Sequence, residues 1–458
     1  MIDRVLGDID ADLGNSLDRL FDWLRIQSIS TDPSYAGECR RAAEWIRGDL
    51  EALGFEASVR ETSFHPVVVG HLPKPGAPHV LFYGHYDVQP VDPIGLWDNP
   101  PFEPLLAATP DGRKVIRARG ACDDKGQVMT FIEACRAWKA TEGGLPVGVT
   151  VLIEGAEENG SKGLPEWLAA NKDELRADCV LVCDTGMWDR TTPLITTSLR
   201  GLVYRELKVR CADRDLHSGT FGGAARNPIR VLARIIADLH DETGRITIPG
   251  FYDGVPETPP DILAQWQALD LTPKDFLGQV GLGVPAGEID RMLIEQIQSR
   301  PTCDVNGIAG GYTAEGSKTV IAGEASAKIS FRLVGDQDPE AIAAAFDAFV
   351  RARIPADCSV EITRYGTSRA IQLPYGMPAL AKAKTALAAE WGREPVFIGA
   401  GGSIPIVADF KTTLGLDTLL VGFGLDDDRV HSPNEKYDLT SFHKGTRSWA
   451  RILGALAE

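Results

Sequence analysis

Four short apolar runs recur along the chain, at residues 80–84, 149–155, 179–184 and 418–424. Runs of this length without polar alternation are typical of strands that are buried on both faces of a largely parallel sheet. Between residues 123 and 141, apolar side chains repeat at helical spacing, which predicts a helix that crosses over between two such strands. The sequence therefore predicts an α/β fold with a mostly parallel main sheet.

A second pattern occupies about residues 201–370. Strand-like and helix-like segments alternate there, in the order VYRELKVR, NPIRVLARIIADLH, SAKISFRLV, PEAIAAAFDAFVRARI and SVEITRY. A chain of 458 residues is long enough for more than one domain, and this pattern indicates an inserted α+β domain. We therefore expect a main domain built from residues 1–200 and 371–458, with the inserted domain at residues 201–370.

The composition excludes several classes of partner. The formal net charge is −17 at pH 7, and no cluster of Lys and Arg provides the charge that phosphate binding needs. No apolar stretch approaches the roughly 20 residues that cross a bilayer, and the first residues lack the features of a signal peptide. The eight cysteines include no Cys-x-x-Cys pair, so free and mostly buried thiols are expected rather than a disulfide framework or a thiolate zinc site. We expect a soluble cytoplasmic protein that binds neither nucleic acid nor membrane.

His85 and Asp87 lie in the segment GHYDVQP, directly after the apolar run at 80–84. In open α/β sheets, ligands bind at the carboxyl ends of the strands. Because alternate residues of an extended chain share one face, Asp87 can reach the same side as His85 and hold its second ring nitrogen. That arrangement is typical of a metal-bound histidine, although the motif alone fits a core or surface histidine equally well.

Two pairs of neighbouring acids follow in the chain. Asp123 and Asp124 lie in RGACDDKG at the start of the predicted helix, where adjacent acids commonly serve only as caps. Glu157 and Glu158 lie in EGAEENGS, after the run at 149–155. Two neighbouring carboxylates at a strand end can divide the roles of metal ligand and proton carrier, although solvated loop acids are the simpler interpretation of either residue alone.

Asp184 ends the run at 179–184, and His431 follows the run at 418–424. Each of these residues alone is weak evidence for a site. Together, five candidate metal ligands lie at strand ends or at a helix start on one predicted rim, namely His85, Asp123, Glu158, Asp184 and His431. Two imidazoles and three carboxylates suit Zn²⁺, and a bridging carboxylate can hold two ions about 3.5–4 Å apart. Mn²⁺ and Co²⁺ remain alternatives.

Six segments resemble the signatures of one known family. They are GHYDVQP, RGACDDKG, EGAEENGS, DLHSGTFGG, GAGGSIPI and HSPNEKY, and they span residues 84–437 in family order. The family contains zinc-dependent dipeptidases of the carnosinase type, carboxypeptidase G, and acetylornithine and succinyl-diaminopimelate deacylases. The resemblance implies a two-domain zinc-exopeptidase fold, in which residues 1–200 and 371–458 form the catalytic domain and the insertion is a ferredoxin-like lid and dimerisation domain.

The resemblance also implies a partition of the metal ligands. His85 and Asp184 would bind one ion, Glu158 and His431 would bind the other, and Asp123 would bridge the two. Two divalent ions per subunit, most naturally Zn²⁺, are therefore the expected cofactors.

Two further catalytic roles follow from the same resemblance. Glu157 would be the general base, which takes a proton from the metal-bridging water and later delivers it to the leaving amine. His217, in DLHSGTFGG, would reach the active site of the other subunit of a homodimer and donate to the oxyanion of the tetrahedral intermediate. Asp87 is the third catalytic candidate, because its spacing to His85 lets it orient the ring.

Substrate contacts are predicted from matching segments. Arg332, in SFRLV, matches the position at which dipeptidase relatives hold a substrate carboxylate, a role suited to a planar two-donor group, although a plain sheet-surface arginine fits as well. Weaker candidates are Asn306, Gly402 and Ser403. Gly399 and Ala400 depart from the family pattern, because animal carnosinase-like dipeptidases carry Arg-Glu there.

The expected function is hydrolysis of the amide bond of a dipeptide or a small peptide-like substrate. The segments VDPIGLWDNPPFEP and ITIPGFYDGV resemble the dipeptidase subgroup more than the shorter deacylases. An N-acyl-amino-acid deacylase, which uses the same chemistry on another acyl group, is the alternative. A non-catalytic amino-acid-binding protein on the same fold is the third hypothesis.

Overall fold

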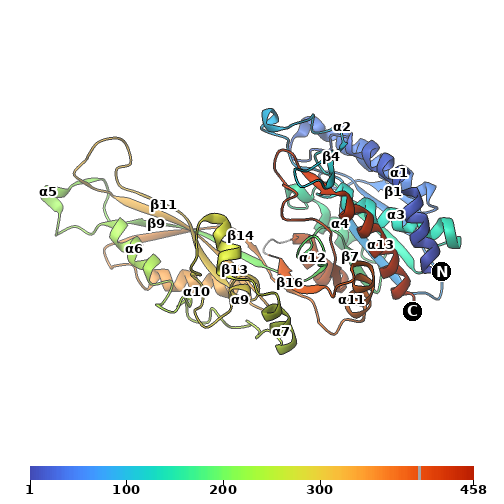
Figure 1. Ribbon diagram of the computed structural model, residues 1–458. Coiled ribbons are helices and arrows are strands. Elements are labelled where there is room, and N and C mark those ends of the chain that lie inside the picture. The colour runs from blue at the N-terminus through green and yellow to red at the C-terminus, as the bar shows by residue number, and fades with distance from the viewer. Residues whose placement is uncertain (401–403) are drawn as a thin grey trace. The chain divides into compact units, whose positions relative to one another are not determined.

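The computed structural model of the protein describes residues 1–400 and 404–458, and the chain divides into two compact units (Figure 1). The first unit contains residues 1–197, 373–398 and 404–458. The second contains residues 198–372 together with Gly399 and Ala400. Each unit has a hydrophobic core of its own.

The first unit is built on a large mixed sheet with a parallel centre. In spatial order its strands are β1 (Glu56–Arg60), β2 (Val67–Leu72), β6 (Gly148–Glu154), β3 (His79–His85), β7 (Cys179–Val182), β17 (Thr418–Leu420), β8 (Leu194–Leu199) and β15 (Ile371–Gln372), and β16 (Val396–Ala400) also pairs with β8. The strands β6, β3, β7 and β17 run parallel, whereas the pairs β1–β2, β2–β6, β17–β8 and β8–β15 are antiparallel. The predicted α/β fold is confirmed, and the carboxyl ends of the four central strands meet at one edge.

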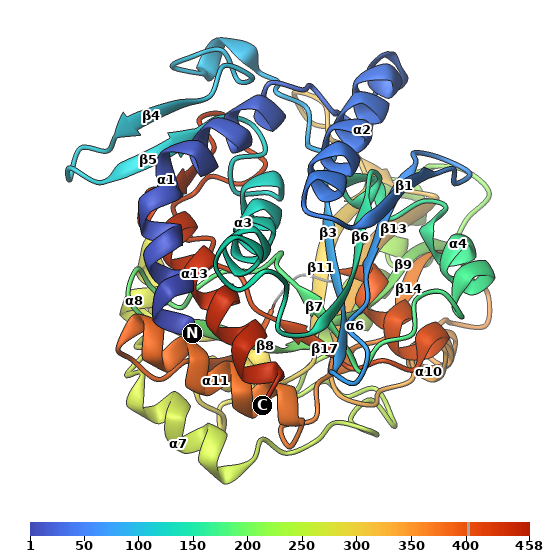
Figure 2. The ribbon, with the colours of Figure 1, turned by 90° about the vertical axis from the view of Figure 1, so that its right-hand side faces the viewer.

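Helices cover both faces of this sheet. They are α1 (Ile2–Leu24), α2 (Ala36–Ala52), α3 (Lys125–Glu142), α4 (Leu164–Asn171), α11 (Pro378–Trp391), α12 (Pro405–Asp409) and α13 (Leu439–Leu456). Figure 2 shows α1, α3, α11 and α13 together on one side of the central strands, with α4 on the other. A smaller sheet in this unit has the order β18 (Lys436–Asp438), β5 (Lys114–Arg117) and β4 (Leu105–Ala108).

The helix α3 is anchored by aromatic packing. Phe131 stacks on Phe82 of β3, with ring centroids 3.8 Å apart, and both rings meet Trp449 of α13 edge-on. All three side chains are fully buried. The helix is capped by Gly143, whose φ of 75° is the left-handed conformation that favours glycine as a cap. Because its core-facing side is fixed in this way, the start of α3 holds the acidic pair beside the end of β3.

The second unit is an antiparallel sheet with two long helices. Its strands have the order β11 (Thr302–Gly310), β13 (Glu324–Leu333), β9 (Gly201–Arg210) and β14 (Ser359–Ser368), and its long helices are α6 (Pro228–Ala237) and α10 (Pro339–Arg351). Along the chain the elements follow as β9-α6-β11-β13-α10-β14, which is the ferredoxin-like arrangement. Shorter elements are β10 (Leu216–His217), α5 (Ser218–Phe221), α7 (Pro260–Ala268), α8 (Pro273–Leu277), α9 (Leu293–Gln298) and β12 (Val320–Ile321).

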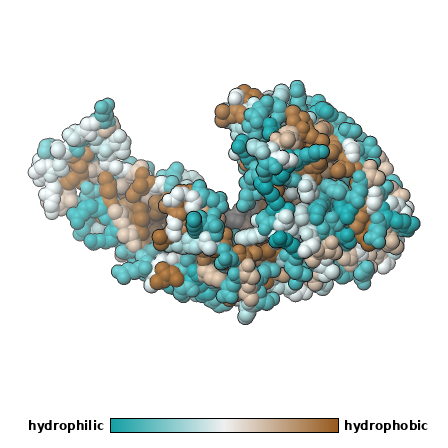
Figure 3. All heavy atoms as spheres, viewed as in Figure 1, coloured by the Kyte–Doolittle hydropathy of each residue, from teal (hydrophilic) through white to brown (hydrophobic). Residues whose placement is uncertain are grey.

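Apolar side chains are exposed on the second unit. Val305 and Ile308 of the edge strand β11 are 44% and 61% exposed. Figure 3 shows brown patches on the face that carries β9 and β11. Among the described residues, no helix is both long and apolar enough to cross a membrane.

Candidate metal centre

The parallel centre of the sheet brings the predicted metal ligands of the first unit to one edge. His85 is the last residue of β3, and Asp184 lies two residues beyond β7. Glu158 lies in a short 3₁₀ helix, Glu157–Asn159, that follows β6. Asp123 precedes α3, and His431 lies in the loop between β17 and β18. Their meeting follows from strand direction, because parallel strands end at the same edge.

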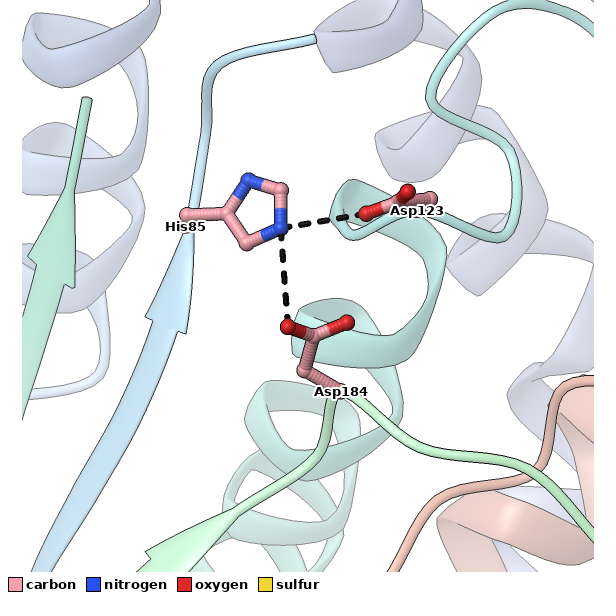
Figure 4. A group of neighbouring side chains, drawn as sticks. All are labelled: His85, Asp123 and Asp184. Atoms are coloured by element: carbon pink, nitrogen blue, oxygen red, sulfur yellow. Dashed lines mark ion pairs between the residues drawn. The ribbon is translucent and has the colours of Figure 1, made fainter. Parts of the chain in front are cut away.

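One group of ligands surrounds the ring of His85. The Nε2 atom of His85 lies 3.1 Å from Oδ1 of Asp123 and 3.9 Å from Oδ2 of Asp184. Figure 4 shows both carboxylates directed at this one nitrogen from different elements. The histidine is fully buried and the two acids are partly buried. The three donor atoms lie close enough together to hold one metal ion.

A second group shares one member with the first. The Nε2 atom of His431 lies 2.9 Å from Oδ2 of Asp123 and 3.1 Å from Oε2 of Glu158. The two carboxylate oxygens of Asp123 therefore face two different histidines. A carboxylate in this position is suited to bridge two cations.

The hydrogen bonds of His85 test whether these residues fit a metal ion. Its Nδ1 atom donates to the main-chain carbonyl of Asp87 at 3.0 Å. Its Nε2 atom is buried and has no hydrogen-bond partner among the described residues. A buried ring nitrogen without a hydrogen-bond partner that faces two carboxylates has the donor geometry of a metal ligand. The site fits a divalent cation.

The carboxylate of Asp87 connects the two ligand groups. Its oxygens accept from the backbone N–H groups of Glu157 and Glu158, at 3.2 and 3.1 Å. Its Oδ1 atom also lies 3.3 Å from Nδ1 of His85. Asp87 therefore holds the turn that carries the two glutamates as well as the histidine ring, and only the second of these roles follows from the sequence pattern.

Burial governs the titration of the acids at this edge. Burial, followed by the charge of Asp124, raises the pKa of Asp184 well above its ordinary value. Burial also raises the pKa of Glu157 to about 7; the charge of His85 opposes this rise, and the neighbouring carboxylates add to it. A carboxyl group with a pKa near neutrality can both accept and release a proton in the working pH range.

Two residues that support the ligand loops were not predicted from the sequence. Glu435 is fully buried, and its Oε1 atom accepts from the backbone N–H groups of Cys122 and Asp123 at 2.9 and 3.0 Å. Its Oε2 atom accepts from the N–H of Gly120 at 2.9 Å and from Nη1 of Arg119 at 2.7 Å. Glu435 thus fixes the loop of Asp123 from the segment HSPNEKY, which also carries His431. That segment was recognised, but only its histidine was assigned a role.

Gln89 is the second missed residue. Its Nε2 atom donates to Oε2 of Glu158 at 2.6 Å. The same oxygen faces His431, so the amide orients the carboxylate toward its partner. Gln89 lies in GHYDVQP, but its position in that segment does not by itself predict a contact with Glu158.

The other predicted residues of the described chain lie in the second unit. His217 is exposed, and its Nδ1 atom accepts from the N–H of Gly219 at 2.9 Å, which leaves Nε2 as the protonated nitrogen. Asn306 is exposed at a bulge of β11, and Arg332 is half-buried on β13. Gly399 and Ala400 end β16, whereas the predictions for Gly402 and Ser403 lie outside the described residues.

Arg200, which immediately precedes β9, was not predicted either. Burial, and then the positive charge of Arg332, lower the pKa of Arg200 to about 10. Its Nη2 atom donates to the carbonyl groups of Gln296 and Arg300, while its buried Nε atom has no partner among the described residues. The charge of Asp304 opposes this lowering, and a bound anion would act in the same direction as Asp304.

Two imidazoles and three carboxylates at the carboxyl edge of a parallel sheet define a candidate centre of the metallohydrolase class. The profile of peptidase family M20/M25/M40 matches residues 81–455. The chain belongs to this family. The resemblance of the six segments is thereby confirmed, as is the expectation that the protein is an amide-bond hydrolase, and the non-catalytic hypothesis is set aside.

Individual relatives cover nearly the whole chain. The Cys-Gly metallodipeptidase dug1 of Schizosaccharomyces pombe is 29% identical, over 100% of this chain and 98% of its own length. The Beta-Ala-His dipeptidase of Homo sapiens is 30% identical, over 100% of this chain and 93% of its own. Among solved structures, the M20 family metallo-carboxypeptidase Sso-CP2 from Sulfolobus solfataricus matches with a TM-score of 0.80 and 30% identity, over 96% of this chain and 99% of its own.

The substitution Glu435→Gln tests the loop that holds Asp123. We expect the metal affinity to fall about 10- to 100-fold, because an amide N–H₂ would face backbone N–H donors and release the loop. The measurement is a competition titration of metal-stripped protein with a chromophoric chelator. The matched control is Asp426→Asn, which changes an exposed acid in the loop between β17 and β18 that also carries Glu435. This variant should bind metal normally. An unchanged Kd in folded Glu435→Gln would contradict the role.

Proposed function

We propose that the protein is a metal-dependent dipeptidase that binds two divalent metal ions, with Zn²⁺ as the expected metal. The observation that carries the proposal is the carboxylate of Asp123, whose two oxygens face His85 and His431 separately. In this proposal Asp184 completes the first ligand group and Glu158 the second. Relatives whose names include metallodipeptidase, dipeptidase and metallo-carboxypeptidase support the choice of reaction.

The metal ions would lower the pKa of a bound water toward about 7 and polarise the scissile carbonyl. Glu157 then acts as the general base, which accepts a proton from the attacking water and passes it to the leaving amine nitrogen. Its pKa of about 7 supports both steps, because the group can bind and release a proton near neutral pH. Asp87 positions this base by accepting the N–H of Glu157.

Arg332 and Arg200 supply positive charge for the free carboxylate of the substrate. The electrostatic effect of Arg332 on Arg200 supports their proximity, and an anion bound by both would relieve the repulsion between them. This feature suits a peptide with a free terminal carboxylate. An N-acyl amino acid carries the same free carboxylate, so the two arginines do not distinguish a dipeptidase from a deacylase. The two activities differ in the group on the other side of the scissile bond, which is an amino acid in one case and a simple acyl group in the other.

In this proposal a homodimer supplies an oxyanion donor to each site. The tautomer of His217, with its Nε2–H free of the contact to Gly219, supports a role as a hydrogen-bond donor. The exposed apolar side chains of β11 support a contact between second units. In this arrangement the histidine of one subunit serves the metal site of its partner.

The general base is tested by Glu157→Gln. We expect kcat to fall about 10²- to 10⁴-fold with both metal ions retained, because the amide cannot carry the proton. Released amino acids are quantified against time, and the metal content is measured by elemental analysis. Glu166→Gln, an exposed acid on α4, should keep normal turnover. Turnover close to that of the unsubstituted enzyme in metal-loaded Glu157→Gln would reject this mechanism.

Substrate class is tested with three matched compounds: a dipeptide, its C-terminal amide, and the N-acetyl derivative of its second amino acid. We expect the dipeptide to be the best substrate and the amide to be roughly 10- to 100-fold poorer in kcat/KM, because a charged hydrogen-bond partner is lost. Arg332→Ala should lower kcat/KM for the dipeptide to about the value for its amide.

Lys328→Ala, on the same strand as Arg332, is the control and should leave this preference intact. Hydrolysis of the N-acetyl amino acid with an inert dipeptide would favour the deacylase. If Arg332→Ala lowers kcat/KM equally for the dipeptide and for its amide, Arg332 does not bind the substrate carboxylate.

The shared histidine is tested by mixing His217→Ala subunits with Glu157→Gln subunits. If His217 acts across the dimer, each mixed dimer regains one complete site, and random reassociation should give about a quarter of the activity of the unsubstituted enzyme. Each variant alone, taken through the same dissociation and reassociation, is the control. Verified mixed dimers without recovered activity would argue against sharing.

A further inference from the structure

Two cysteines face one another in the second unit. The Sγ atoms of Cys211 and Cys358 lie 2.7 Å apart although 147 positions separate them in the sequence. Cys211 directly follows β9, and Cys358 directly precedes β14. The register of these antiparallel strands pairs Arg210 with Ser359, so the two cysteines are the next opposite pair of the ladder.

The backbone hydrogen bonds show which kind of pair this is. The N–H of Cys211 donates to the carbonyl of Gly323, at 3.0 Å, and the N–H of Cys358 donates to that of Pro355, at 2.9 Å. Neither bond joins the two cysteines, so they form a non-hydrogen-bonded pair, in which opposite Cα atoms lie about 4.5 Å apart. That separation falls inside the range of about 4.4–6.8 Å that a disulfide spans.

Accessibility separates these two thiols from the others. Cys211 and Cys358 are partly exposed, whereas the other six cysteines are buried. A small oxidant therefore reaches this pair in the folded protein and does not reach the rest. The sequence pattern predicted only free thiols, because neither cysteine lies near another cysteine along the chain.

We propose that Cys211 and Cys358 are a site of reversible disulfide formation by exchange with a low-molecular-weight disulfide such as oxidised glutathione. The thiolate of one cysteine attacks the reagent, forms a mixed disulfide and releases one thiolate. The second cysteine then attacks the mixed disulfide at the protein sulfur and releases the other. The protons of the two protein thiols end on the two released thiols, so one disulfide is reduced as one is formed.

The short distance between the two sulfurs lets each resolve a mixed disulfide formed on the other. Burial and then the neighbouring thiol of Cys358 raise the pKa of Cys211 to about 12. Either thiol can make the first attack, and the other can then resolve the mixed disulfide, because the two sulfurs lie 2.7 Å apart. In a reducing compartment the pair stays reduced until such an oxidant accumulates.

The pair lies at the base of the segment that carries His217. This segment begins at Cys211 and continues to Arg226, whose Nε atom lies 2.9 Å from Oδ1 of Asp357. Its two ends therefore contact consecutive residues, Asp357 and Cys358. Oxidation would replace one of these two contacts with a covalent bond. Any effect on turnover through His217 rests on the proposed function, whereas the disulfide itself does not.

The test uses full-length protein incubated with oxidised glutathione and then denatured for thiol titration. We expect the count to fall by two from the eight cysteines of the chain, and peptide mapping to join the peptides of Cys211 and Cys358. The midpoint of thermal unfolding should rise by a few degrees on oxidation and return on reduction. Cys303→Ser, a buried cysteine of the same unit, is the control and should retain the cross-link.

The single variants test whether Cys211 and Cys358 form the disulfide with one another. In Cys211→Ser and in Cys358→Ser we expect no cross-link and at most one glutathione, attached to the cysteine of the pair that remains. Circular dichroism under reducing conditions verifies that each variant is folded, and either variant alone suffices if the other does not fold. Eight free thiols in folded, oxidant-treated protein, or a cross-link between other cysteines, would overturn the proposal. Neither outcome depends on whether the protein hydrolyses dipeptides.

Discussion

The carboxylate of Asp123 lies between two histidines, and much of the first unit serves to keep it there. Its Oδ1 atom lies 3.1 Å from Nε2 of His85, and its Oδ2 atom lies 2.9 Å from Nε2 of His431. The backbone beneath it is held by Glu435, 312 positions away in the sequence. The core packing of α3 against β3 fixes the direction from which the acid approaches. A small shift of the loop would separate the two ligand groups, since they share only this one residue.

The same edge of the sheet concentrates acidic groups that are costly to bury without compensation. Burial raises the pKa of both Asp184 and Glu158, and the two histidines offset only part of the negative charge. Divalent cations would provide the compensating charge, and metal binding and the order of these loops would then support one another. Glu157 lies in the same short helix as Glu158 but belongs to neither ligand group, which suits it to proton transfer.

In the second unit, the register of the antiparallel strands decides which residues meet. Its antiparallel ladder pairs segments that are distant in sequence, and the pairing of β9 with β14 alone brings Cys211 opposite Cys358. The ladder between β10 and β12 holds His217 at the tip of an exposed segment. The charge of Arg332 on β13 acts on Arg200, which precedes β9, because neighbouring strands bring the two together. These juxtapositions depend on strand register.

The sequence by itself determined the local features. Apolar runs predicted the central strands, but β7 ends at Val182 and β17 at Leu420, earlier than the runs, because polar and glycine residues leave the ladder. Helical spacing predicted α3, and the motifs indicated the ligand residues of the first unit. Only the tertiary structure decided that the two oxygens of Asp123 face different histidines, that Glu435 holds its loop, and that two cysteines meet. Periodicity encodes which face of an element is buried, whereas contacts between distant segments depend on register and loop course, which local spacing does not encode.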